Sequence, residues 1–227
     1  MKRTIFLLCI STYLFTACVH ESLYVAVEEE NVSVTDDCDP DIIYFVNDVM
    51  PIIGSNCAIS GCHGGGSAED GVELSTYANI LQYIDPGNAQ DSKIYELITE
   101  TDPDKIMPLP PNEPLTPDQR EIIRNWIDQG ATNQECTACD LTNVTFSQSV
   151  WTIIQNSCTG CHSGDTPQGG LSLTNYDQVA QIAQSGLLSG VINHDPGFVA
   201  MPFNGQQLST CKIDIIEEWI SQGFPNN

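Results

Sequence analysis

The sequence predicts an all-α protein built from two tandem small helical domains. Three observations support this fold class. The 227-residue chain contains two copies of one pattern, each copy begins and ends with an amphipathic helix, and little of either copy alternates between apolar and polar residues with a period of two. An internal repeat in a chain of this length favours two small domains over one large one.

The first helix of each copy leads into a cysteine motif. Cys38 stands nineteen residues before Cys57, and Cys139 stands nineteen residues before Cys158. Between them "FVNDVMPIIGSNC" matches "FSQSVWTIIQNSC". The apolar positions have the i, i+4, i+7, i+8 spacing of one helix face. They are Phe45, Val49, Ile52 and Ile53 in the first copy, and Phe146, Val150, Ile153 and Ile154 in the second.

The last helix of each copy lies in "REIIRNWIDQGA" and "IDIIEEWISQGF". Thr116 and Ser209 stand where N-caps belong, Pro117 suits the first helical position, and Gly130 and Gly223 suit C-terminal caps. The predicted buried faces are Ile122, Ile123, Trp126 and Ile127, and Ile215, Ile216, Trp219 and Ile220. The Gly-, Pro- and Asn-rich middle of each copy predicts irregular loops, so each copy buries only a thin core by itself.

The repeat defines the expected domain boundaries. The first domain spans residues 38–136 and the second spans residues 139–227. Residues 18–37 are acidic and lack a sustained amphipathic pattern, so we expect a flexible tether there.

The N-terminus predicts export. In residues 1–17, Lys2 and Arg3 precede an apolar run that is too short to span a bilayer, which indicates a signal peptide. The next letters, "LFTAC", resemble the bacterial lipobox, so Cys18 would become the lipidated first residue of an envelope lipoprotein, anchored by more than one acyl chain. Ordinary signal cleavage is the alternative, because Phe15 stands where leucine is commoner.

Charge excludes one class of partner. The chain has 30 acidic and 7 basic residues, and removing residues 1–17 takes away two basic residues, which leaves a formal charge of 5 − 30 = −25. Such a surface repels nucleic acid and anionic lipid. It predicts partners with a basic docking face and an association that slows as salt concentration rises.

The second cysteine motif is the more specific one. Cys158-Thr159-Gly160-Cys161-His162 is the pattern for covalent attachment of a c-type haem. Two thiols one helical turn apart can reach the vinyl groups on one porphyrin edge, and His162 can then ligate the iron. A disulfide, or half of a zinc site completed by Cys136 and Cys139, is the alternative.

The first motif departs from this spacing. Cys57 and Cys62 are five residues apart, while Cys62 and His63 keep the adjacent pair that sets the iron ligand. We expect the two extra residues to loop outward, and Gly64 to Gly66 to suit a backbone that passes close to a flat ligand. A local disulfide between Cys57 and Cys62 is the alternative.

A sixth iron ligand is available in each copy. Met107 in "KIMPLPP" and Met201 in "VAMPFNG" occupy matching places, each before a proline that stiffens the loop. Methionines that merely fill gaps in the core are the alternative. His194 is a rival ligand in the second copy, where we favour an exposed loop histidine.

These motifs make residues 40–227 resemble two tandem class I cytochrome c domains, similar to the cytochrome c modules of planctomycete and Bacteroidetes envelope proteins. The resemblance implies that each small domain wraps around one covalent haem c. It implies Cys57, Cys62, His63 and Met107 for one haem, and Cys158, Cys161, His162 and Met201 for the other. The four-residue gap in the first motif departs from the common family pattern and puts haem loading there in more doubt.

Four further cysteines remain as disulfide candidates: Cys38, Cys136, Cys139 and Cys211. We favour Cys38 with Cys136 and Cys139 with Cys211, because each pair would close one domain. In the competing pairing, Cys136 and Cys139 would form a local redox disulfide and Cys38 would pair with Cys211.

The expected function is electron transfer between redox proteins by a dihaem cytochrome in the bacterial cell envelope, at the outer membrane. Iron with histidine on one side and methionine on the other has no open coordination position, so we expect an electron carrier and no enzyme. The alternatives are a dihaem peroxidase, a haem-free lipoprotein held together by disulfides, and a thiol redox protein that uses Cys136 and Cys139.

Overall fold

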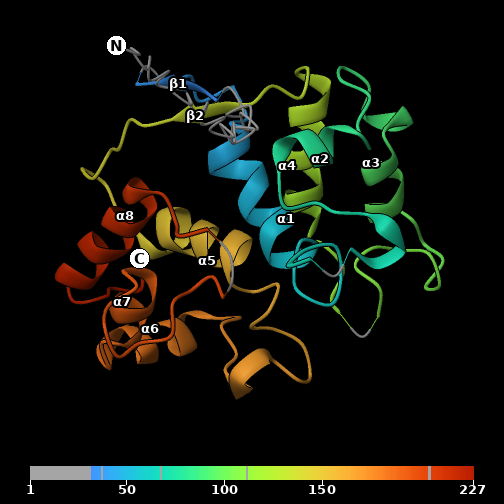
Figure 1. The fold of residues 1–227 in the computed structure, drawn as a ribbon. Helices are drawn as coiled ribbons and strands as arrows, with labels where there is room; N and C mark the ends of the chain where they lie inside the picture. Colours follow the sequence, from blue (N-terminus) through green and yellow to red (C-terminus); the bar gives the residue numbers. More distant parts are fainter. Residues whose placement is uncertain (1–31, 37, 67, 111, 204–205) are drawn as a thin grey trace, which may run out of the picture.

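The computed structural model describes residues 32–36, 38–66, 68–110, 112–203 and 206–227 (Figure 1). The predicted signal peptide, Cys18 and most of the predicted tether lie outside these residues. The described chain is dominated by helices, which agrees with the predicted all-α class. None of its helices is long and apolar enough to cross a membrane.

The helices of the two copies follow the same order, except that the described residues of the second copy lack a counterpart of η3. In the first module (residues 38–136) they are η1 (Phe45–Val49), α1 (Met50–Asn56), η2 (Glu69–Gly71), α2 (Tyr77–Leu81), η3 (Ala89–Asp91), α3 (Lys93–Ile98) and α4 (Pro117–Asp128). In the second module (residues 139–227) they are η4 (Phe146–Val150), α5 (Trp151–Ser157), η5 (Gln168–Gly170), α6 (Tyr176–Gln184), α7 (Leu187–Ile192) and α8 (Thr210–Ser221).

The entry helix of each module is a π-helical turn, η1 or η4, that continues into α1 or α5. The predicted apolar face is buried in both modules. Its members are at most 6% exposed: Phe45, Val49, Ile52, Ile53, Phe146, Val150, Ile153 and Ile154.

Each module contains its own hydrophobic cluster, within residues 45–131 in the first and 144–219 in the second. The centre of each cluster is a tryptophan on the last helix, Trp126 on α4 and Trp219 on α8, and both are fully buried. Their indole N–H groups donate to backbone carbonyls just beyond the helix, at 3.0 Å and 2.9 Å. The predicted buried faces of α4 and α8 therefore pack as the periodicity indicates.

The ends of these helices match the predicted caps with one exception. The Thr116 hydroxyl accepts a hydrogen bond from the Gln119 N–H in a capping box, and Gly130 and Gly223 adopt φ values of 99° and 83°, as C-terminal caps require. Ser209 occupies the N-cap of α8 without a side-chain cap hydrogen bond.

A short parallel sheet, which the sequence analysis did not anticipate, joins a strand just before the first module to a strand at its end. Strand β1 (Ser33–Thr35) pairs with β2 (Gln134–Cys136). β1 lies within the stretch expected to be a tether, where Val32, Val34 and Thr35 supply β-branched side chains.

The two modules meet where α1 lies beside α5 (Figure 1). The Ser55 hydroxyl donates to the Asn156 carbonyl at 2.9 Å, and the Gln119 side-chain amide donates to the Gln155 carbonyl at 3.1 Å. The ends of α1 and α5 carry the cysteine motifs, so this contact also fixes how the two motifs face each other.

Candidate haem-binding sites

The second motif forms one turn at the end of α5. The Cys158 N–H donates to the Ile154 carbonyl at 2.9 Å, and the Cys158 carbonyl accepts from the N–H groups of Cys161 at 3.1 Å and His162 at 3.0 Å. The backbone of the whole motif is therefore tied to the first cysteine. This turn holds both thiols and the imidazole on one short, hydrogen-bonded segment.

In the first motif the carbonyl of the first cysteine again accepts the histidine N–H, although two more residues lie between them. The His63 N–H donates to the Cys57 carbonyl at 3.1 Å, while the Cys62 N–H turns to the Ile59 carbonyl at 3.0 Å. Just beyond the motifs the two modules again share a hydrogen bond. The Cys62 carbonyl accepts the first N–H of η2 at 2.8 Å, and the Cys161 carbonyl accepts the first N–H of η5 at 2.9 Å. The longer spacing is thus absorbed in a loop between the cysteines, as we expected.

The glycines after His63 have a more local reason than the expected contact with a flat ligand. A Cβ built on Gly64 would lie 2.1 Å from the Ala58 carbonyl oxygen, so Gly64 lets the chain close over the enlarged loop. Gly65 and Gly66 have φ values of 65° and 78°, which favour glycine.

The two motif histidines are oriented in the same way. Nδ1 of His63 lies 3.2 Å from the Val72 carbonyl oxygen, and Nδ1 of His162 lies 3.0 Å from the Leu171 carbonyl oxygen. A carbonyl can only accept, so Nδ1 carries the proton and, in the neutral ring, Nε2 keeps its lone pair. This is the arrangement in which a protein presents histidine to a metal.

The four motif cysteines are free thiols: Cys57, Cys62, Cys158 and Cys161. The alternative disulfide between Cys57 and Cys62 is therefore not formed in this structure. Burial raises the pKa of Cys57 and of Cys158 to about 12. These thiols are protonated at neutral pH and pack against the two hydrophobic clusters, so they lack the thiolate character of a redox-active pair.

The two methionines occupy matching loops. The Met107 N–H donates to the Leu97 carbonyl near the end of α3 at 3.0 Å, and the Met201 N–H donates to the Val191 carbonyl near the end of α7 at 2.9 Å. Both side chains are partly exposed, and both precede a cis proline. These loops are therefore built alike. His194 is exposed, and its Nε2 lies 3.0 Å from the backbone carbonyl oxygen of Met201. The imidazole therefore contacts the backbone of the methionine loop.

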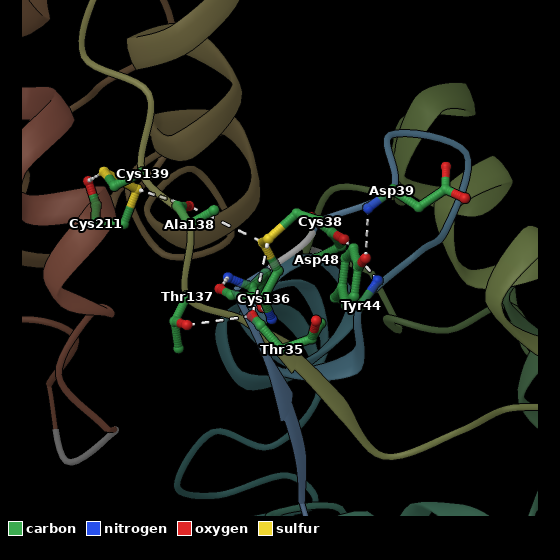
Figure 2. Close-up of a disulfide and its surroundings, with 11 residues drawn as sticks. Thr35, Cys38, Asp39, Tyr44, Asp48, Cys136, Thr137, Ala138, Cys139 and Cys211 are labelled. Carbon is green, nitrogen blue, oxygen red and sulfur yellow. Dashed lines mark hydrogen bonds between the residues drawn. A yellow bond between two sulfur atoms is a disulfide. The ribbon is translucent and has the colours of Figure 1, made fainter.

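The other four cysteines form the favoured disulfides, Cys38–Cys136 and Cys139–Cys211, with Cα separations of 5.6 Å and 5.4 Å. Figure 2 shows them on either side of Ala138, whose carbonyl oxygen lies 4.0 Å from Cys136 Sγ and 3.8 Å from Cys211 Sγ. Cys136 and Cys139 are thus bonded to other cysteines. Neither is available as a zinc ligand, and they do not form the local redox disulfide that was the alternative.

The two motifs approach each other, a feature that sequence reasoning missed. Cys161 Sγ lies 3.7 Å from the Ser55 carbonyl oxygen, and burial together with the nearby Cys62 thiol raises the pKa of Cys161. A Cβ on Gly160 would lie 2.3 Å from the same Ser55 oxygen. Gly160 is therefore required for the close contact between the modules, in addition to its place in the motif.

A half-buried lysine at the module junction was also missed. Lys212 on α8 donates to the Asn47 carbonyl of the first module, beside a cavity of about 350 Å³. Burial lowers the pKa of Lys212 to about 8, against the opposing effect of the Asp48 carboxylate. Burial raises the pKa of Asp48, and the Tyr44 N–H and Lys212 partly offset that shift. The isolated lysine in the sequence gave no signal of this contact.

The donor set fits a covalent haem at both motifs. Each offers two free thiols, an imidazole with Nε2 available, and a thioether on a loop of its own. Among the described residues no three His, Cys, Asp or Glu side chains gather as a metal-ion cluster.

Comparison with known proteins gives one finding. The family model described as Planctomycete cytochrome C matches residues 60–112, which include Cys62, His63 and Met107 of the first module. No curated protein and no solved structure matches the chain. Residues 60–112 are thus similar to cytochrome c, a likeness that indicates electron transfer in general and a covalently bound haem.

Proposed function

We propose that this protein is a dihaem c-type cytochrome of the bacterial cell envelope that relays electrons between redox proteins. Cys57, Cys62, His63 and Met107 would hold one haem, and Cys158, Cys161, His162 and Met201 would hold the other. When bound, the iron supplies a one-electron couple, and methionine ligation raises its potential relative to a second histidine.

The observation that carries the proposal is the shared hydrogen-bond frame of the two motifs. In both, the first cysteine's carbonyl accepts the histidine N–H, and the histidine's Nδ1 bonds to a carbonyl nine residues further on. Because this frame survives the different cysteine spacing, the first motif supports haem attachment as well as the second does. We therefore propose that the first motif, with its longer loop, is loaded with haem as well as the second.

The contact between the modules supports a relay in series. The thiols of Cys62 and Cys161 are close enough to raise the pKa of Cys161, and both belong to the motif that would carry a porphyrin edge. The chain itself fixes this approach through Ser55, Asn156 and Gly160. Electrons would therefore enter through one module and leave through the other.

The N-terminal sequence and the net charge support the proposed setting of the protein. A lipidated Cys18 would anchor it at the outer membrane, and its acidic surface would select partners with basic docking faces and exclude nucleic acid. A histidine and a methionine on each iron leave no position for peroxide, so we propose a carrier and no enzyme.

Intact mass of the protein exported from a host with haem-attachment machinery tests the proposal. We expect two haems, one triacylated N-terminal cysteine and two disulfides. His162→Ala should abolish low-spin coordination at the second haem, whereas the matched variant His194→Ala should leave both spectra unchanged. A folded protein without haem would overturn the proposal in favour of a disulfide-linked lipoprotein, and a five-coordinate haem that turns over peroxide would favour a peroxidase.

A further inference from the structure

The methionine loop of the second module carries more exposed apolar side chains than the described part of the first methionine loop does. Leu187, Phe198, Val199 and Phe203, here called the apolar patch, are 37%, 44%, 57% and 66% exposed. All four belong to α7 or to the loop around Met201. Large exposed apolar side chains that gather in one segment mark an interaction site more often than single ones do.

The first module provides an internal comparison. Helices α3 and α7 occupy equivalent places, and the Met107 and Met201 N–H groups bond to equivalent carbonyls, so positions that differ by 94 correspond. The counterparts of Leu187, Phe198 and Val199 are Lys93, Asp104 and Lys105, whereas the counterpart of Phe203 is Leu109, which is 43% exposed. Lys93 and Lys105 form ion pairs with Glu96 and Asp102 at 2.9 Å and 3.3 Å. At three of the four corresponding positions, the first module therefore has charged residues where the second has exposed apolar ones.

The Phe198 ring is held in place. A Cβ built on Gly190 would lie 2.6 Å from three atoms of that ring, so the ring packs against the bare backbone of α7. Gly190 corresponds to Glu96 of the first module. Bonds from the Asp195 N–H to the Gly190 carbonyl at 3.0 Å and from the Phe198 N–H to the Asp195 carbonyl at 3.1 Å fix the loop. An ordered aromatic ring loses little conformational entropy when a partner covers it.

The charge around the patch identifies the partner's chemistry. Residues 139–227 contain seven Asp or Glu residues and one Lys or Arg. That one cation, Lys212, reaches the Asn47 carbonyl of the first module and is unavailable to the patch. Asp195 is exposed within the loop itself, and Glu217 accepts hydrogen bonds from Ser189 and Asn193 on and beside α7. A partner therefore meets an apolar centre with an acidic rim.

We propose that the apolar patch of the second module is the docking surface for a redox protein whose own face has an apolar centre and a rim of lysines or arginines. This proposal rests on the proposed function. It adds a direction of electron transfer between the modules, because the described residues place such a patch on the second module alone. Long-range attraction would set the association rate, and burial of the Phe198 ring would set the lifetime of the complex.

A substitution that adds negative charge to the patch distinguishes electrostatic attraction from burial of the Phe198 ring. Phe198→Asp gives the second module the residue of the first and makes the rim more acidic. If attraction alone held the complex, binding to a basic partner would tighten. If the patch docks, we expect affinity for a lysine-rich basic cytochrome c, measured by calorimetry at low salt on the haem-loaded protein, to fall about tenfold or more. Leu109→Asp, which introduces the same charge at an exposed apolar residue of the first module's methionine loop, should leave affinity unchanged.

Hydrogen–deuterium exchange should show protection of residues 187–203 in the complex. Equal affinity for Phe198→Asp and the parent protein would overturn the proposal. A changed methionine–iron absorption band in Phe198→Asp would instead assign the ring to the haem pocket. Loss of self-association in sedimentation, or of binding to phosphatidylethanolamine–phosphatidylglycerol vesicles, would assign the patch to a second copy or to a membrane. Absence of haem would refute the proposed function, and calorimetry on that haem-free protein would then test the docking surface by itself.

Discussion

The Ser55 hydroxyl of the first module donates a 2.9 Å hydrogen bond to the Asn156 carbonyl of the second. Each of these residues stands two positions before the first cysteine of its motif, so the modules touch at equivalent places. Ser55 is buried, and its hydroxyl also lies 2.8 Å from the Pro51 carbonyl of its own helix. The contact therefore joins the ends of α1 and α5, from which both motifs depart.

The close approach at Gly160 predicts an unusual effect of a single methyl group. Gly160→Ala should destabilise the protein by about 1–3 kcal/mol, because its Cβ would overlap the Ser55 carbonyl and backbone cannot move aside cheaply. Urea unfolding of the haem-loaded protein measures the change. Gly54→Ala is the control: nothing lies within 4 Å of its Cβ, and alanine within α1 should stabilise by roughly 0.5–1 kcal/mol. Equal effects of the two changes would show that the modules do not pack as described.

The two methionine loops predict separable changes in potential. Met107→His and Met201→His should each lower the potential of one haem and leave the other unchanged, because a second imidazole stabilises the oxidised iron more than a thioether does. A spectroelectrochemical titration of each variant measures this. Met50→Leu, at a methionine packed against the first core, should shift neither potential. A variant that shifts neither haem would remove that methionine from the ligand set.

The lowered pKa of Lys212 predicts that the free energy of unfolding depends on pH in the alkaline range. Its pKa is lowered from 10.5 to about 8 in the folded protein, so between these values the unfolded chain binds more protons. The free energy of unfolding therefore rises with pH across this window, by roughly 2 kcal/mol between pH 7 and pH 10. In Lys212→Met this contribution should be missing, as the difference between two series of urea titrations would reveal. Parallel pH profiles for the parent and the variant would contradict it.

The two disulfides predict separate losses of stability. Cys38 and Cys136 are 98 residues apart, and Cys139 and Cys211 are 72 residues apart, so the chain-entropy model gives about 4–5 kcal/mol for each crosslink. The double variants Cys38→Ser with Cys136→Ser, and Cys139→Ser with Cys211→Ser, should each lose stability by that order in chemical denaturation. Peptide mapping without reduction should recover both crosslinked pairs from the parent protein, and recovery of a Cys136–Cys139 peptide would refute the pairing.

Most of the local structure could be predicted from the sequence. The apolar stripe from Phe45 to Ile53 and its copy predicted two buried helix faces, because a period near 3.6 places those side chains on one side of a helix. Thr116 and Gly130 marked the ends of α4 for equally local reasons, since capping depends on a residue and its immediate neighbours.

The helical class, the repeat and the residues that offer thiols, imidazoles and thioethers could all be predicted from the sequence, since these follow from short-range spacing. The three-dimensional structure was needed to show that the Cys161 thiol contacts the Ser55 carbonyl and that Gly160 packs against the same residue. The physical reason is that such contacts join residues far apart in the chain, and the periodicity of one helix carries no information about which surface of another it will meet.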